Sequence, residues 1–256
     1  CAVELLQAFA LVHDDVMDGS PTRRGHPTVW AKFIERHRDG GWQGEDRRFG
    51  EAAAILVGDI AIVMADRQLT GATTAVRKIW DALRTELNMG QYLDVIGTAT
   101  GEITAEGARL IMKHKTAGYT NVRPLQIGAA LAGRPELADA LAAHGMPLGI
   151  AFQLRDDMLG AFGDSAKTGK PVGDDLREGK PTVLLAKARG TASATQLEVL
   201  DRVGQPHLSD HDVSAIQQVM VDTGSVAASE RETNQLLGDA ISAIESLPDP
   251  NGSQSA

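Results

Sequence analysis

The chain is poor in cysteine and in aromatic side chains, which make up 4% of its 256 residues. Because Cys1 is the single cysteine, the sequence excludes an internal disulfide and a cysteine-based metal cluster, and it suits a reducing cytoplasm. The charge balance lacks a basic excess: the net charge is −9, which disfavours non-specific binding to nucleic acid. We therefore expect no nucleic-acid partner.

Long hydrophobic runs are also missing. The longest, "AAAILVGDIAIVMA" at residues 52–65, is too short to span a bilayer and carries Asp59 in its middle. It predicts a buried helix, and we expect no transmembrane segment. The first residues lack the basic stretch and the cleavage site of a signal peptide, so we expect a cytoplasmic protein.

Alternating β-branched runs are few and a βαβ rhythm is absent, whereas helical periodicity covers most of the chain. The sequence therefore predicts an all-α fold, with one domain over residues 1–247 and a disordered tail at 248–256. The chain starts inside a helical pattern without a capping residue, so we expect this domain to be incomplete at its N-terminus. Helices are predicted at residues 1–18, 29–37, 51–70, 73–96, 104–120, 121–133, 136–160, 183–189, 194–203 and 226–247, with one more opened by Ser209 and Asp212, and loops at 19–28, 38–50 and 160–182.

Three acids stand close together at the end of the first predicted helix. Asp14 and Asp18 are one helical turn apart and point the same way, with Asp15 beside them. Such like charges repel, and the helix dipole disfavours them at a C-terminus, unless a cation lies between them. Carboxylate oxygens with open positions suit Mg²⁺. Taken alone, the cluster is equally compatible with solvated acids at a helix end.

A second acid pair, Asp156 and Asp157, ends another apolar helix. Two carboxylate banks can hold several Mg²⁺ ions around one polyanion. Basic residues follow these acids in loops or near predicted helix ends, and arginine and lysine there can bind phosphate groups. Each basic residue alone favours a solvated surface role, whereas together they describe a pocket for diphosphate groups. These residues are Arg23, Arg24, Lys113, Lys115, Lys167, Lys170, Arg177 and Lys180.

In their order, these motifs resemble those of the trans-isoprenyl diphosphate synthases, the polyprenyl synthetase family. "DDVMD" with "RRGHPT" matches the first aspartate-rich motif and the arginine pair of that family. The segments "GQYLD", "KHKTAGYT", "GIAFQLRDD" and "GKPVGDDLREGKPT" follow in the family's order. The match is clear over residues 1–185 and looser beyond.

The resemblance implies a helical bundle around a deep central cavity, with the two acid motifs facing each other across its mouth. It further implies an enzyme in which Mg²⁺ holds an allylic diphosphate, the allylic C–O bond ionises, and the double bond of isopentenyl diphosphate attacks the carbocation before a proton is lost. Dimers are usual in the family, so we expect a homodimer. The implied metal ligands are Asp14, Asp15, Asp18, Asp156 and Asp157; the implied contacts to the allylic diphosphate are Arg23, Lys115, Thr116, Gln153, Lys170 and Lys180, with Lys115 and Lys170 also counted as catalytic; Arg24 is the implied contact to isopentenyl diphosphate.

Some residues of these motifs receive a weaker assignment. Phe9 and Ala10 precede Asp14 at positions that set product length in the family, and this pattern resembles enzymes that stop at the C20 product, geranylgeranyl diphosphate; Phe9 is equally compatible with ordinary core packing. His13 is interpreted as a packed neighbour and not as a base. Gln91 and Asp94 match a recurring motif, but the sequence assigns them no role beyond packing.

Two departures from the family pattern stand out. Gly160 occupies a position where many members have a third aspartate, which Asp164 is a candidate to replace. No counterpart of the family's upstream "GGKR" region is present, so we expect the isopentenyl diphosphate site to lack part of its cation set. Two alternatives stay open: a non-catalytic partner subunit of a prenyl diphosphate synthase, and a class I terpene cyclase, which the "LRDDMLG" motif, the lysines and the "RRG" pair disfavour.

Overall fold

The computed structural model describes residues 1–101, 104–163 and 172–247 of the chain. This part is almost entirely helical, so the prediction of an all-α chain is confirmed. It divides into two compact units, one formed by Cys1–Thr73 and the other beginning at Thr74. Each is described by itself, and the prediction of one domain over 1–247 stays a prediction. The predicted tail at 248–256 lies outside the described residues.

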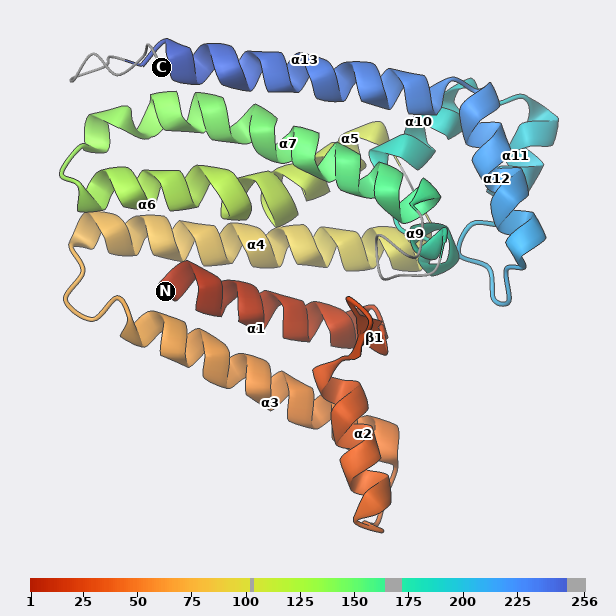
Figure 1. Cartoon of the computed structure of the whole chain (residues 1–256), viewed down its shortest axis with the longest axis horizontal. Coiled ribbons are helices and arrows are strands. Elements are labelled where there is room, and N and C mark those ends of the chain that lie inside the picture. Colours follow the sequence, from red (N-terminus) through yellow and green to blue (C-terminus); the bar gives the residue numbers. More distant parts are fainter. Residues whose placement is uncertain (102–103, 164–171, 248–256) are drawn as a thin grey trace. The chain divides into compact units, whose positions relative to one another are not determined.

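The first unit holds two long helices packed along each other, α1 (Ala2–Met17) and α3 (Asp46–Arg67), and a shorter helix, α2 (Val29–Asp39), that packs on α3 (Figure 1). A short antiparallel hairpin, β1 (Thr22–Arg23) and β2 (His26–Pro27), joins α1 to α2. Gly58 lets α1 and α3 approach closely, since a Cβ there would lie 2.3 Å from the His13 ring.

The second unit is built around α7, which packs against α13 on one side and against η1 and α6 on the other (Figure 1). Its core joins Met158 of α7 to Leu184, Leu185, Ile216 and Met220. Its elements are α4 (Thr74–Thr100), α5 (Ala105–Ile111), the π-helix η1 (Met112–Val122), α6 (Arg123–Leu131), the 3₁₀ turn η2 (Pro135–Leu137), α7 (Ala138–Phe162), α9 (Asp174–Glu178), α10 (Val183–Thr191), α11 (Ala194–Leu200), α12 (Asp210–Asp222) and α13 (Ser225–Glu245).

Three predicted elements differ from those observed. The predicted loop 38–50 is shorter, because α2 continues to Asp39 and α3 already starts at Asp46, an acid that suits the first turn of a helix. The predicted loop 160–182 contains α9, between two glycines with positive φ, Gly173 and Gly179. The predicted helix 104–120 is an α-helix only to Ile111 and continues as a π-helix.

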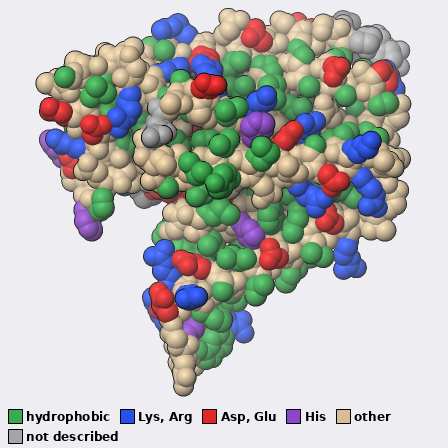
Figure 2. All heavy atoms as spheres, turned by 180° about the vertical axis from the view of Figure 1, so that it is seen from behind, with side chains coloured by type: hydrophobic (Ala, Val, Ile, Leu, Met, Phe, Trp, Pro, Cys, Tyr) green, Lys and Arg blue, Asp and Glu red, His purple; other side chains and the backbone are tan. Residues whose placement is uncertain are grey.

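None of the helices in the described part of the chain is both long and apolar enough to cross a membrane. The apolar run at 52–65 lies within α3, where Ala54, Gly58 and Ala65 are buried. Several larger side chains on the same helix, including Leu56 and Ile60, are exposed, which contradicts the prediction of a wholly buried helix. Figure 2 shows one face of the molecule, on which hydrophobic side chains lie between charged ones.

Candidate active site

The last turn of α1 carries the first acid cluster. The Asp15 side chain is buried at 5% exposure, while Asp14 and Asp18 are partly exposed. Asp18 caps the helix, and its backbone N–H donates to the Asp14 carbonyl at 2.8 Å. The cluster therefore lies at the C-terminal end of the helix, where the dipole disfavours negative charge, as the sequence predicts.

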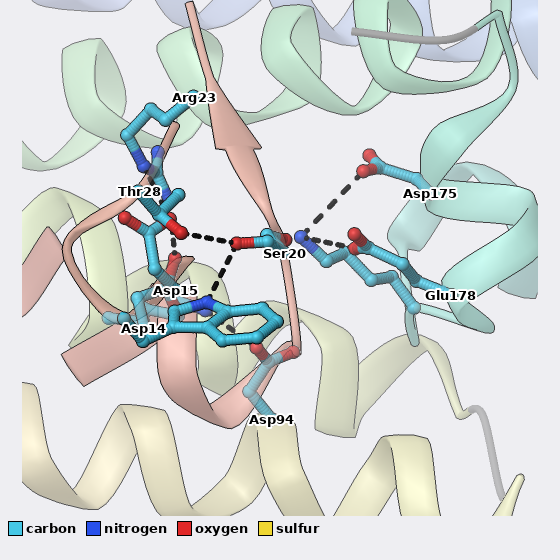
Figure 3. Close-up of polar contacts among 11 residues, drawn as sticks. Asp14, Asp15, Ser20, Arg23, Thr28, Asp94, Asp175 and Glu178 are labelled. Atoms are coloured by element: carbon cyan, nitrogen blue, oxygen red, sulfur yellow. Dashed lines mark hydrogen bonds and ion pairs between the residues drawn. The ribbon is translucent and has the colours of Figure 1, made fainter. Parts of the chain in front are cut away.

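Arg23 joins two of these carboxylates (Figure 3). Its Nε donates to Asp15 Oδ1 at 2.7 Å and its Nη2 donates to Asp14 Oδ2 at 3.2 Å. Burial raises the pKa of Asp15, and the Arg23 hydrogen bond opposes this shift without cancelling it. Both carboxylates thus point toward one shared positive group.

The hairpin that carries the arginines has a defined backbone. Arg24 and Gly25 connect its strands, and both have positive φ, of 53° and 76°, as in a type I′ turn. Because the left-handed region is unusual for a residue with a Cβ, Arg24 holds a mildly strained conformation at the exposed tip. The turn therefore places Arg24 at the exposed tip of the hairpin.

The loop after α1 is held by two side chains, one from the N-cap residue of α2 and one from its first turn (Figure 3). Thr28 Oγ1 donates to the Ser20 carbonyl at 3.0 Å, and Trp30 Nε1 donates to the same carbonyl at 2.9 Å. The Thr28 backbone N–H also donates to the Pro21 carbonyl. These bonds hold the backbone of the loop at Ser20 and Pro21.

In the second unit, η1 places two predicted substrate residues side by side. Lys115 Nζ lies 2.6 Å from Asp94 Oδ2 on α4. Thr116 Oγ1 donates to Gln153 Oε1 on α7 at 2.5 Å. π-Helical turns are frequent at functional sites, and here the turn directs adjacent side chains to two different helices.

A hydrogen-bond chain continues from Thr116 into the second acid cluster. Gln153 Nε2 donates to Asp157 Oδ1 at 2.8 Å. Asp157 is buried, whereas Asp156 is exposed. Burial raises the pKa of Asp157 to about 7; the negative charges of Asp175 and Asp156 add to this shift, and Gln153 opposes it.

The space beside Gly160 is occupied by a side chain from another helix. A Cβ at Gly160 would lie 1.9 Å from Oδ2 of Asp175, so the carboxylate of α9 occupies the space beside α7 that a side chain would need. Asp175 also lies 3.8 Å from Lys180 Nζ, which is 3.0 Å from Glu178 (Figure 3). Asp164, the candidate replacement for the third aspartate, lies outside the described residues, as does Lys170.

The structure thus brings together Asp14, Asp15 and Arg23 in one unit, and Thr116, Gln153 and Asp157 in the other. Phe9 and Ala10 are half-buried on α1. His13 is a packed neighbour, as predicted: its ring contacts Phe9, and Nε2 lies 3.0 Å from the Ile55 carbonyl oxygen.

The residues present fit Mg²⁺ in their donor chemistry. The predicted ligands of each unit supply hard carboxylate oxygens, and those of Asp14 and Asp15 converge on a single cation, the Arg23 guanidinium. Within the described residues, no group of three or more His, Cys, Asp or Glu side chains has a geometry that could hold a metal ion. The predicted ligands therefore match Mg²⁺ in the type of their oxygen atoms and in their negative charge.

Two functional candidates were missed by the sequence interpretation, Asp94 and Asp175. The sequence assigns Asp94 to packing and gives Asp175 no role; both have buried or half-buried carboxylates beside predicted substrate lysines. The available signal for Asp94 is an acid within an otherwise apolar helical pattern, which requires a partner when it is buried; Asp175, in a polar stretch, has no such signal.

The first acid cluster lies at the end of α1, whereas Asp156 and Asp157 lie inside α7, which continues to Phe162 beyond the predicted helix end. An all-α chain with two such acid clusters, and with lysines and arginines paired to acids, has the features of a trans-prenyltransferase. A model of the polyprenyl synthetase family matches residues 1–220, and the chain belongs to this family. The geranylgeranyl diphosphate synthase of Mycobacterium tuberculosis is 35% identical, and the match covers 95% of this chain and 67% of that protein. The (2E,6E)-farnesyl diphosphate synthase of the same organism is 32% identical over 98% of this chain and 67% of that protein.

Solved structures agree. A geranylgeranyl pyrophosphate synthase from Corynebacterium glutamicum, complexed with isoprenyl diphosphate and magnesium, superimposes with a TM-score of 0.92 and 40% identity, covering 98% of this chain and 73% of that one. The resemblance to the family predicted from the motifs is therefore confirmed.

Proposed function

We propose that this chain condenses isopentenyl diphosphate with an allylic diphosphate to give a longer trans-prenyl diphosphate, with Mg²⁺ as cofactor. The observation that carries the proposal is the convergence of Asp14 and Asp15 on one cation in a chain of this family. When bound, Mg²⁺ would withdraw negative charge from the departing diphosphate.

The roles of the chain's own residues follow from their chemistry. Asp14, Asp15 and Asp18 would hold the metal from α1, and Asp156 and Asp157 would hold it from α7. Lys115 and Lys180 supply positive charge for the allylic diphosphate, and Arg23 supplies a planar fork suited to phosphate oxygens. Thr116 and Gln153 orient that group through the hydrogen-bond chain to Asp157.

Arg24 has a separate role in this proposal. It lies at the tip of the hairpin, outside the Asp14–Arg23–Asp15 cluster, and we assign it to the diphosphate of isopentenyl diphosphate. We further propose geranylgeranyl diphosphate as the product, action in the cytoplasm and a homodimer. The relatives' names and the Phe9–Ala10 pair support the product; the family resemblance supports the other two.

The test is a condensation assay with Mg²⁺, isopentenyl diphosphate and radiolabelled allylic diphosphates of increasing length, with the products sized by chromatography. We expect a C20 product, and longer products from Phe9→Ala. The double substitution Asp14→Ala with Asp15→Ala should lower the rate at least about 100-fold. Asp239→Ala, which removes an exposed acid from α13, is the matched control and should leave the rate unchanged.

The assay also separates the alternatives. A folded chain that binds allylic diphosphate with Mg²⁺ but forms no product would contradict the proposal and favour a partner subunit. Cyclised hydrocarbon from an allylic diphosphate alone would favour a terpene cyclase. Sedimentation velocity at micromolar concentration tests the homodimer.

A further inference from the structure

The motif "GQYLD" on α4 has a place in the structure that the proposed function does not use. Asp94 is 7% exposed, and its Oδ2 lies 2.6 Å from the Nζ of Lys115. A buried carboxylate requires a partner, because its desolvation is costly when it is unpaired. The Lys115 ammonium provides that partner across 21 residues of sequence.

The same face of α4 is shaped to receive η1. Gly90 lies one turn before Asp94, and a Cβ there would lie 2.3 Å from the backbone N of Lys115. The backbone of Lys115 therefore approaches α4 as closely as a glycine permits. Gly90 sets the position of the Lys115 main chain, and Asp94 sets the position of its side-chain end.

The face continues toward the second substrate lysine. Gly97 lies less than one turn beyond Asp94, and a Cβ there would lie 2.8 Å from Cγ of Pro181, the residue after Lys180. One strip of α4 thus contacts the segments that carry both described lysines assigned to the allylic diphosphate. Within it, Asp94 is the charged member and the one that contacts a lysine ammonium group.

We propose that Asp94 is a positioning residue, which holds the ammonium group of Lys115 in the orientation that binds the allylic diphosphate. A lysine side chain rotates about four bonds and loses much of this freedom when its ammonium group binds a substrate. Asp94 restricts the Lys115 side chain before the substrate arrives, so less conformational entropy is lost when the substrate binds. The proposal rests on the proposed function, because it takes Lys115 as a contact to the allylic diphosphate.

The test compares Asp94→Asn, which has nearly the same shape without the charge, with Asp94→Glu, which keeps the carboxylate. Asp94→Asn should raise the KM for the allylic diphosphate about tenfold and leave the KM for isopentenyl diphosphate unchanged. Asp94→Glu should recover most of the affinity. Asp81→Asn is the matched control, since Asp81 lies on the same helix and pairs with Arg84 while 67% exposed; it should change neither KM.

A double-mutant cycle with Lys115→Ala decides whether Asp94 acts through Lys115. In the Lys115→Ala background, Asp94→Asn should have no further effect on the allylic KM. A full tenfold effect there, or an unchanged or lower allylic KM for Asp94→Asn in the wild-type background, would overturn the proposal. If Asp94→Asn does not fold, as thermal melting would show, Asp94→Ala carries the test: its cycle with Lys115→Ala must show coupling, and additive effects overturn the proposal.

Failure of the proposed function gives a different result. In that case Lys115→Ala itself leaves the allylic KM unchanged, or the wild-type chain forms no condensation product. Failure of the inference alone leaves Lys115→Ala impaired and Asp94→Asn normal.

Discussion

The guanidinium of Arg23 binds the carboxylates of Asp15 and Asp14 at once, at 2.7 and 3.2 Å. Because Asp15 is 5% exposed, loss of this partner would leave a buried carboxylate without its cation. Arg23→Gln should therefore lower the free energy of unfolding by about 1–3 kcal/mol, measured by urea denaturation in the presence of a chelator.

Added Mg²⁺ should recover more stability in Arg23→Gln than in the wild-type chain, because the metal replaces the missing positive charge between the carboxylates. Arg47→Gln on α3 removes an exposed ion pair with Glu51 and is expected to change stability by less than about 1 kcal/mol, with no added response to Mg²⁺. An equal Mg²⁺ response in all three proteins would argue against metal binding at these acids.

Substitutions at Arg24 should affect the binding of one substrate and not of the other. Its φ of 53° suits glycine or asparagine, so Arg24→Gly and Arg24→Asn should keep the hairpin and the melting temperature. Both should raise the KM for isopentenyl diphosphate about tenfold, which corresponds to one lost charged contact. Steady-state kinetics with each substrate varied in turn is the measurement, and a rise in the allylic KM alone would assign Arg24 to the other substrate.

Gly160 should not tolerate the aspartate that many family members carry at this position. Since a Cβ would lie 1.9 Å from Asp175 Oδ2, Gly160→Asp and Gly160→Ala both require the Asp175 side chain, or the helix that carries it, to move. We expect a loss of about 1–3 kcal/mol in the free energy of unfolding for Gly160→Ala, and more for Gly160→Asp because of the added like charge.

The matched control is Gly128→Ala on α6, where a Cβ has no neighbour within 4 Å. It should be neutral or stabilising by up to about 1 kcal/mol, because alanine favours helix. Adding Asp175→Gly to Gly160→Ala should recover part of the lost stability. If it does not, the carboxylate of Asp175 is not what limits the space at Gly160.

The raised pKa of Asp157 predicts a pH-dependent stability. The folded chain keeps this proton up to a pH of about 7, whereas the unfolded carboxyl loses it near its ordinary pKa of 3.8. Folding therefore takes up a proton between these values, and the contribution of Asp157 to stability falls as the pH rises from about 4 to 7 and is constant above.

Asp157→Asn removes this dependence. Measured with a chelator, its free energy of unfolding relative to the wild-type chain should increase between pH 4 and 8, by about 4 kcal/mol at most. Asp239→Asn, which removes an exposed acid from α13, is the control and should show a much flatter difference. A flat difference for Asp157→Asn would mean that the buried carboxyl titrates near its ordinary pKa.

Helices could be predicted where their signals are local. The capping box of Ser209 and Asp212 opens α12 as its sequence predicts. The π-helical turn at Lys115 has no such signal, because it depends on the close approach of Gly90 and Gly149 from two other helices. Likewise, α9 follows a glycine-rich stretch, and its few residues give no helical period.

The acids of the site could be predicted from their spacing, but their partners could not. Asp14 and Asp18 face one side of a helix by geometry alone. The bond from Arg23 to Asp15 depends on the path of a hairpin, and the pair of Lys115 and Asp94 joins residues 21 positions apart. The sequence shows that Gly160 departs from the family pattern. The reason that a glycine fits there is the Asp175 side chain, which belongs to another helix.

The hydrogen bonds from Thr28 and Trp30 to the Ser20 carbonyl hold the start of the loop that carries Arg23 and Arg24, and neither bond involves a charged group. A threonine hydroxyl and an indole N–H hold the start of the loop, and the arginines lie further along it. A protein with this arrangement can exchange the residue at position 24, at the tip of the hairpin, and so change its preference for one anionic substrate over another, without a new loop. Thr28 and Trp30, which need not touch any substrate, are then the residues that limit how this site can evolve.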